Sequence, residues 1–190
     1  MIAALLVLHG LAHAAIGALP RLFFKQGRHN LLWWLTAGPF FANGAILLLT
    51  AAQVVPTFVP LEGAFGRALA AASVPFAAAA IALLFFTLGT HRIPIALWHQ
   101  ADDAPRHIVT WGAYARIRHP FYASFIMALL GAFVFAPSAG TAATLLLGVL
   151  QLNRTAAREE VLLAASEFGA EYRAYVARTG RFVPRLREAA

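Results

Sequence analysis

The sequence predicts an all-α membrane protein, and three observations lead to this fold class. Of the 190 residues, 61% are hydrophobic and only 12% are charged, which is about half the charged fraction of a soluble domain. The apolar residues gather in long uncharged runs, and the basic residues gather in every second connection between them. We therefore expect a single membrane domain over residues 1–190, with about five membrane-embedded helices and a cytoplasmic C-terminal helix.

Three uncharged runs within residues 1–89 predict three spanning helices. They cover Met1–Leu19, Leu31–Ala52 and Ala68–Gly89. A helix needs about 20 residues to cross ~30 Å of hydrocarbon at ~1.5 Å per residue. The first run has no basic segment before it, so we expect a spanning helix there rather than a signal peptide.

Two shorter apolar runs predict a helical hairpin over residues 121–152. The runs are Phe121–Ala136 and Ala139–Leu152, and Pro137, Ser138 and Gly140 lie at the turn between them. Proline and glycine at such a position are typical of a helix–turn–helix connection. The two arms therefore lie side by side and end on the side from which the hairpin began.

The tail after the hairpin predicts a surface helix rather than a further span. Apolar residues recur there at steps of three and four, with charged residues between them, which indicates one apolar stripe. The stripe consists of Val161, Leu162, Ala165, Phe168, Tyr172, Tyr175 and Val176. Gly180 and Pro184 are expected to end this helix.

The distribution of basic residues predicts the orientation in the membrane. The basic connections hold Arg21, Lys25 and Arg28, then Arg92, Arg106, Arg116 and Arg118, then seven arginines after Leu152, whereas Gln53–Gly66 holds only Glu62. The positive-inside rule then places the N-terminus outside and the tail in the cytoplasm. Orientation also explains the net charge of +7 better than binding to nucleic acid does. The preference for arginine over lysine and the high alanine and glycine content indicate a GC-rich bacterial genome, so we expect the protein in a bacterial inner membrane.

Cysteine is absent, which excludes disulfides, a thiolate nucleophile and cysteine-ligated metal centres. We expect no metal cofactor.

Polar residues concentrate in two stretches on the predicted cytoplasmic side, His99–Tyr122 and Arg154–Tyr175. In order, the motifs are Gly112-x-Tyr114, Arg118-His119-Pro120-x-Tyr122, the apolar hairpin, Glu159-Glu160, and Phe168-Gly169-x-Glu171-Tyr172-x-x-Tyr175. Over about Gln100–Pro184 this order resembles the isoprenylcysteine carboxyl methyltransferase family and its phospholipid methyltransferase relatives. The resemblance implies a cofactor-binding core at residues 90–190 that moves a methyl group from S-adenosylmethionine to a lipophilic acceptor.

The resemblance also implies which residues form the site. Arg118, His119 and Glu160 are the implied catalytic residues. The implied cofactor contacts are Gln100, His107, Ile108, Val109, Tyr114, His119, Pro120, Phe121, Tyr122 and Glu160. Glu159, adjacent to Glu160, is expected to be solvated or to pair with a neighbour.

The chemistry of these side chains suits the cofactor. Arg118 and His119 would donate to its carboxylate, and Glu160 would accept from its ammonium or ribose. The rings of Tyr114 and Tyr122 would flank its adenine or sulfonium. No general base stands out, and positioning of donor and nucleophile would supply much of the rate enhancement.

One departure from the family bears on the acceptor. The prenylcysteine enzymes carry an arginine one turn before the glutamate matched by Glu160, and this chain has Ala156 there, with Arg154 and Arg158 on either side. We expect these two arginines to contact the acceptor. A prenylcysteine-like carboxylate, a lipid amine and a thiol all stay open.

Two other functions stay open. NADPH-dependent sterol and steroid reductases share an Arg-His-Pro-x-Tyr segment, but they continue with residues that Phe121 and Ala123 do not match. A non-catalytic membrane protein would bind haem through His9 and His13, which share one helical face. For these two histidines, and for Asn43 and Ser73, we instead expect hydrogen bonds between helices.

Overall fold

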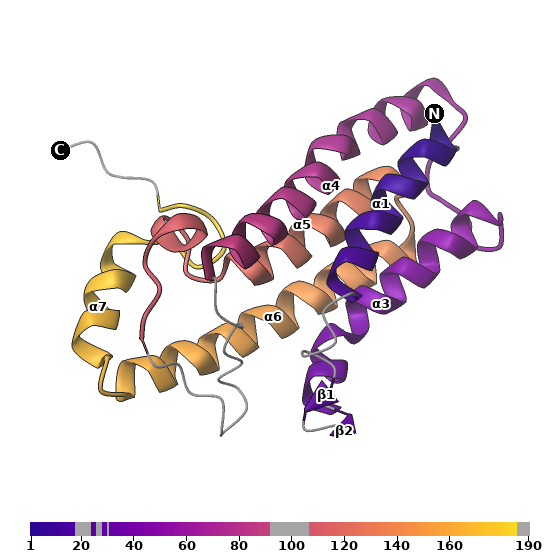
Figure 1. Cartoon of the computed structure of the whole chain (residues 1–190). Coiled ribbons are helices and arrows are strands. Elements are labelled where there is room, and N and C mark those ends of the chain that lie inside the picture. Colours follow the sequence, from indigo (N-terminus) through magenta and orange to yellow (C-terminus); the bar gives the residue numbers. More distant parts are fainter. Residues whose placement is uncertain (18–23, 26–27, 30, 92–106, 186–190) are drawn as a thin grey trace. The chain divides into compact units, whose positions relative to one another are not determined.

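The computed structural model describes residues 1–17, 24–25, 28–29, 31–91 and 107–185, and its fold is helical (Figure 1). The helices are α1 (Ile2–Gly17), α3 (Leu31–Ala51), α4 (Ala64–His91), the 3-10 helix η1 (Gly112–Ala115), α5 (Pro120–Phe135), α6 (Ala139–Ala165) and α7 (Gly169–Arg178). Two strands of two residues each, β1 (Phe24–Lys25) and β2 (Arg28–His29), pair antiparallel. The sequence pattern did not predict this small pair, and the predicted all-α class is otherwise confirmed.

Two helices are long and apolar enough to cross a membrane among the residues described. These segments are Trp33–Ala51 in α3 and Ala64–Thr90 in α4. Ile2–Ile16 in α1 and Pro120–Phe135 in α5 are apolar but shorter. All four lie where uncharged runs predicted helices, and the sequence places α6 correctly up to Leu152.

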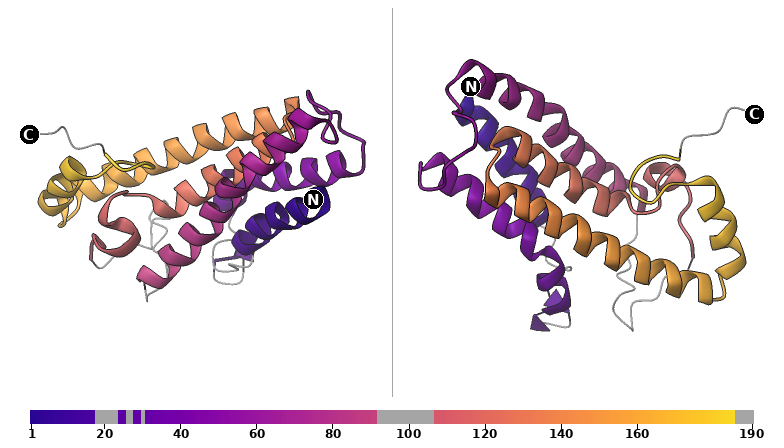
Figure 2. Two further views of the ribbon diagram at one scale, coloured as in Figure 1. Left: turned by 90° about the horizontal axis from the view of Figure 1, so that it is seen from above. Right: turned by 180° about the vertical axis from the view of Figure 1, so that it is seen from behind.

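The chain divides into two compact units. The first contains residues 1–82 and 124–151, and the second contains residues 83–123 and 152–190. In the first unit, α1, α3 and the included parts of α4, α5 and α6 lie alongside one another (Figure 2). Most of the hairpin therefore belongs to this helical bundle.

The core of the first unit combines alanines with larger apolar side chains. Leu47, Ala70, Ala132, Phe135 and Ala136 form one buried cluster. Alanine lets helix backbones approach closely, which is how helices pack within lipid.

Large apolar side chains of the first unit also lie on its surface. Val7, Leu35, Leu48 and Leu146 are each more than half exposed. Exposed apolar surface of this kind is expected where lipid rather than water contacts the helices.

Buried polar groups cross-link the helices of the first unit, as predicted. His9 Nε2 lies 3.0 Å from Ser73 Oγ, and His13 Nε2 lies 3.1 Å from Asn43 Oδ1. The Asn43 amide donates to Thr144 Oγ1 at 2.7 Å. The first bond joins α1 to α4, and the other two connect α1, α3 and α6. Interhelical hydrogen bonds are thus confirmed for the four residues for which the sequence predicts them: His9, His13, Asn43 and Ser73.

The prediction of one continuous tail helix was wrong. The second hairpin arm does not end at Leu152 but continues to Ala165, and α7 begins only at Gly169. The Ser166 hydroxyl donates to the Leu163 carbonyl and accepts from the Phe168 amide. A Cβ atom on Gly169 would lie 2.4 Å from the Ala164 carbonyl oxygen, so this turn requires glycine. Local hydrogen bonding thus breaks the helix although the apolar spacing continues across the break.

Candidate functional site

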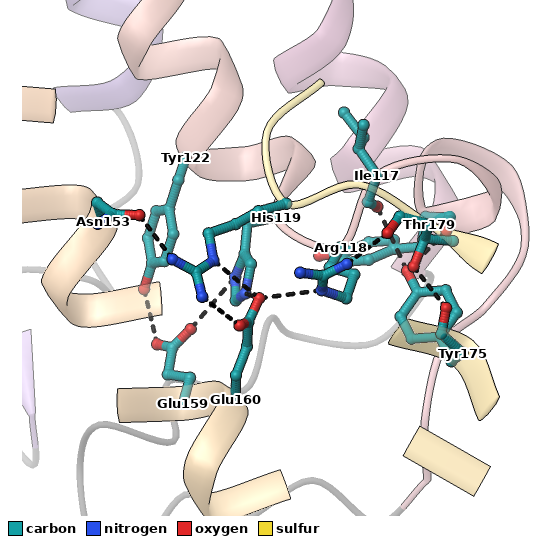
Figure 3. Close-up of polar contacts among 11 residues, drawn as sticks. Ile117, Arg118, His119, Tyr122, Asn153, Glu159, Glu160, Tyr175 and Thr179 are labelled. Atoms are coloured by element: carbon teal, nitrogen blue, oxygen red, sulfur yellow. Dashed lines mark hydrogen bonds and ion pairs between the residues drawn. The ribbon is translucent and has the colours of Figure 1, made fainter. Parts of the chain in front are cut away.

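Three segments of the second unit bring their polar side chains together (Figure 3). The segment before α5 supplies Arg118 and His119, and the first turn of α5 that continues it supplies Tyr122. Helix α6 supplies Asn153, Glu159 and Glu160, and the segment after α7 supplies Thr179 and Arg181. We call the side chains of Arg118, His119, Tyr122, Glu159, Glu160 and Arg181 the Glu160 cluster.

The Glu160 carboxylate accepts hydrogen bonds from three side chains. Its Oε1 atom accepts from Arg118 Nε at 3.0 Å, Arg181 Nε at 3.1 Å and His119 Nε2 at 3.2 Å. Its Oε2 atom accepts from Arg181 Nη2 at 2.5 Å. The Glu160 side chain is only 14% exposed. These are charge-assisted bonds in a partly shielded place, where they are strong.

The charge of Glu160 is fixed by its neighbours. Burial alone would raise the pKa of this carboxyl. The hydrogen bonds from His119, Arg181 and Arg118 outweigh burial and hold the pKa of Glu160 well below its usual range. Glu160 therefore stays ionised at neutral pH.

The contacts of Glu160 bear directly on its predicted role. A carboxylate offers about four lone-pair sites, and four N–H groups already point at Glu160. The structure thus directs Arg118 and His119 to Glu160 itself, whereas the sequence pattern had suggested that each of these three residues faces the cofactor. In this arrangement Glu160 orients the two donors, and its own contact with a cofactor stays a prediction.

Glu159 joins the same cluster from the adjacent position. Tyr122 Oη donates to Glu159 Oε1 at 2.7 Å, and His119 Nδ1 lies 3.5 Å from Glu159 Oε2. The His119 and Tyr122 rings stack with their centroids 5.5 Å apart. The imidazole thus lies between two carboxylates, one at each ring nitrogen. The expectation that Glu159 pairs with a neighbour is confirmed.

The backbone after α7 fixes the backbone that carries Arg118 and His119. Ile117 and Gly180 form a parallel β-bridge. The Arg118 amide donates to the Gly180 carbonyl at 2.8 Å, and the His119 amide donates to the Arg181 carbonyl at 3.0 Å. We call residues 179–182 the C-terminal strap. A Cβ atom on Gly180 would lie 1.8 Å from the Val183 carbonyl oxygen, so the tight path of the strap requires glycine.

Side chains reinforce this pairing. Arg118 Nη1 donates to the Thr179 carbonyl at 2.5 Å. Arg181 Nη1 donates to Asn153 Oδ1 at 2.7 Å. The strap is therefore tied to α6 and to the segment before α5 by both backbone and side-chain bonds.

The Gly112-x-Tyr114 motif is held by two contacts. Gly112 has φ +58°, a left-handed conformation that favours glycine, and the Ala113 amide donates to Thr90 Oγ1 at 3.1 Å. The Tyr175 hydroxyl donates to the Tyr114 carbonyl at 2.7 Å. Burial, then the neighbouring Tyr175 and Glu159, raises the pKa of Tyr114 above its usual range. Tyr114 is therefore a neutral ring at any physiological pH.

Five other predicted site residues are not part of the Glu160 cluster. Pro120 and Phe121 are buried in the first turn of α5. His107 is exposed and stacks on Trp111, and Ile108 and Val109 are half-buried beside it in sequence. The structure does not bring these three into the Glu160 cluster.

The structure describes the two arginines that were predicted to contact the acceptor, but it does not describe the glutamine that was predicted to contact the cofactor. Arg154 and Arg158 are exposed one turn apart on α6, and neither forms an ion pair with a carboxylate in the part of the chain that is described. Gln100 lies outside the described residues. The proposed contacts of these residues with acceptor or cofactor stay predictions.

Sequence reasoning missed Arg181, the residue with the most contacts to Glu160. The sequence pattern predicts only the end of a helix at Gly180 and Pro184, and Arg181 between them belongs to no recognisable motif. The signal that was present is an arginine directly after a glycine at the end of a helix. Only the fold reveals that this residue returns to α6.

Among the described residues, no three His, Asp or Glu side chains are arranged to hold a metal ion.

Comparison of the chain with protein-family models, with curated proteins and with solved structures found no match. The resemblance to methyltransferases therefore rests on the motifs quoted above, and the activity follows as a proposal from those motifs and the geometry of the Glu160 cluster.

Proposed function

We propose that the chain is an integral membrane methyltransferase that transfers the methyl group of S-adenosylmethionine to a lipophilic acceptor. One observation carries this proposal. The Arg118-His119 motif and the Glu159-Glu160 motif, about 40 residues apart in sequence, form one hydrogen-bonded cluster. These are the two motifs on which the resemblance depends, and their contact supports treating them as one site.

The apolar helices support the membrane part of the proposal. We infer that α1, α3 and α4 span the bilayer and that α5 and the first half of α6 form an embedded hairpin. Two of these helices have spanning length, and large apolar side chains of the first unit are exposed. With the N-terminus outside, the Glu160 cluster lies at the cytoplasmic surface of what we take to be a bacterial inner membrane.

The donors of the cluster fit the anionic end of the proposed cofactor. A guanidinium has five N–H groups, and Arg118 uses its Nε and one Nη1 hydrogen in the bonds described. Three N–H groups of Arg118 have no hydrogen-bond partner among the described residues, and in the proposed site they would donate to the cofactor carboxylate. Glu160 holds this guanidinium in place, so little side-chain freedom is lost when a ligand binds.

The tyrosines fit the cationic and aromatic parts. Burial keeps Tyr114 neutral, and the rings of Tyr122 and His119 are buried and stacked next to the carboxylates. The electron-rich face of a tyrosine attracts cations. When bound, S-adenosylmethionine would supply a methyl group on a sulfonium, which is a good leaving group.

A binding measurement tests the proposed cofactor. Isothermal titration calorimetry in detergent is expected to show binding of S-adenosylmethionine and of S-adenosylhomocysteine, with little binding of NADPH. The opposite preference would reassign the chain to the membrane reductases.

A labelling experiment then identifies the acceptor. The purified protein is incubated with membrane lipid extract and cofactor that carries a deuterated methyl group. Mass spectrometry is expected to show one lipophilic compound gaining the label. Cofactor binding without labelling of any lipophilic compound would contradict the acceptor class.

A further inference from the structure

The C-terminal strap carries the one cation of the Glu160 cluster that the motifs did not include. Arg181 binds both oxygens of Glu160, through Nε at 3.1 Å and Nη2 at 2.5 Å. Its third contact, to Asn153 Oδ1 at 2.7 Å, reaches α6 nearly two turns before Glu160. A planar guanidinium bound at two points to one carboxylate fixes the direction of that carboxylate as well as its charge.

The effect of Arg181 reaches Arg118 and His119 by two routes. Glu160 Oε1 is shared by Arg181, Arg118 and His119, so the orientation set by Arg181 determines where the other two donors point. The Arg181 carbonyl also accepts from the His119 amide. One residue therefore contacts both the carboxylate that binds the Arg118 and His119 side chains and the backbone amide of His119.

We propose that Arg181 is a positioning residue of the cofactor site, which orients Arg118 and His119 through Glu160. This role rests on the proposed methyltransferase function. In this role Glu160 binds mainly Arg181 of the strap, rather than the cofactor. The role also makes the C-terminal strap a part of the site that a truncated chain would lose.

The role is tested by the affinity for S-adenosylhomocysteine, measured by calorimetry in detergent. Arg181→Gln removes the charge and both bonds to Glu160, and the affinity is expected to fall about tenfold or more. Arg181→Lys retains the charge but offers a single point of contact, so its affinity is expected to lie between those of Arg181→Gln and the unaltered protein. Arg185→Gln is the matched control, because exposed Arg185 lies four residues further on and bonds only the Ala177 carbonyl among the described groups; it is expected to bind normally.

A double variant separates positioning from direct contact with the ligand. If Arg181 acts through Glu160, Arg181→Gln combined with Glu160→Gln binds no more weakly than Glu160→Gln alone, since coupled residues are not additive. Losses that multiply would overturn the proposed route. Circular dichroism measures the helix content of each variant. If Arg181→Gln does not fold, Arg181→Lys is used in its place.

The two proposals fail in different ways. If the unaltered protein binds no S-adenosylhomocysteine, the proposed function is overturned and this role of Arg181 with it. If the unaltered protein binds and Arg181→Gln and Arg181→Lys bind within twofold of it, only the role of Arg181 is overturned.

Discussion

At the scale of single residues, the contacts of Glu160 set its contribution to stability. The pKa of Glu160 is held below its usual range by hydrogen bonds from His119, Arg181 and Arg118. A carboxylate whose pKa falls on folding stabilises the fold above its unfolded pKa, about 4.3 for glutamate, and loses that contribution as the pH falls.

Glu160→Gln is therefore expected to lower the melting temperature at pH 7 by about 3–12 °C, because a hydrogen-bonded charge contributes about 1.5–3 kcal/mol and each kcal/mol shifts the melting temperature of a chain of this size by about 2–4 °C. The difference from the unaltered protein should shrink as the pH falls below about 4. Thermal denaturation in detergent from pH 7 to pH 3 measures both effects. Glu167→Gln, which changes an exposed carboxylate, serves as control and should leave the melting temperature unchanged.

A difference that stayed constant down to pH 3 would show that Glu160 does not owe its stabilising effect to its charge.

The sequence could predict the contact of Arg118 and His119 with Glu160, but it could not predict that Arg181 also binds Glu160. A hairpin returns the chain to the side it left, so its two ends meet whatever lies between them. Arg181 follows a further turn at Ser166, and that turn arises from side-chain hydrogen bonds to the backbone rather than from spacing. The apolar period continues across the turn, and periodicity alone therefore predicted one helix where there are two.

At the scale of elements, the C-terminal strap depends on glycine at position 180. A methyl group there would meet the Val183 carbonyl oxygen at 1.8 Å, which the backbone can relieve only by moving. Gly180→Ala is expected to cost about 2 kcal/mol or more in the free energy of unfolding, and to weaken cofactor binding with it. Denaturation and calorimetry in detergent measure the two effects.

The control is Gly89→Ala in helix α4, where a Cβ atom meets nothing within 4 Å. Alanine is the better helix former by about 0.5–1 kcal/mol, so this change should leave stability equal or higher. Equal losses for Gly89→Ala and Gly180→Ala would refute the steric explanation.

The helices of the first unit are joined by the polar bonds around Asn43. Asn43→Ala removes contacts to His13 and Thr144, and each interhelical hydrogen bond within lipid contributes about 0.6 kcal/mol on average. A loss of about 1–2 kcal/mol is expected in denaturation by sodium dodecyl sulfate. Thr57→Ala, which removes only a bond to Val59 within one loop, should cost less, and the reverse order would contradict a cross-linking role for Asn43.

At the scale of the whole molecule, the alternation of basic and non-basic connections predicts the topology. A reporter fused after Ala190 is expected to be cytoplasmic, and one inserted near Gly63 is expected to be external. Accessibility of the two reporters to a membrane-impermeant reagent in intact cells measures this. Reversed accessibility would move the Glu160 cluster to the other face of the membrane and away from a cytoplasmic cofactor.

The pairing of the strap with the segment before α5 also determines the order in which the protein matures. Chains are synthesised from the N-terminus, so the residues of every apolar helix are joined before Arg181 is added. Contacts that join distant parts of the sequence form late because loop closure precedes them. Residues of the helical bundle, and Arg118, His119 and Glu160 with them, are thus all present before Arg181, which joins the Glu160 cluster after them. We expect a chain that stops short of Gly180 to insert in the membrane but to lack the contacts of Arg181 with Glu160, and so to bind the proposed cofactor weakly.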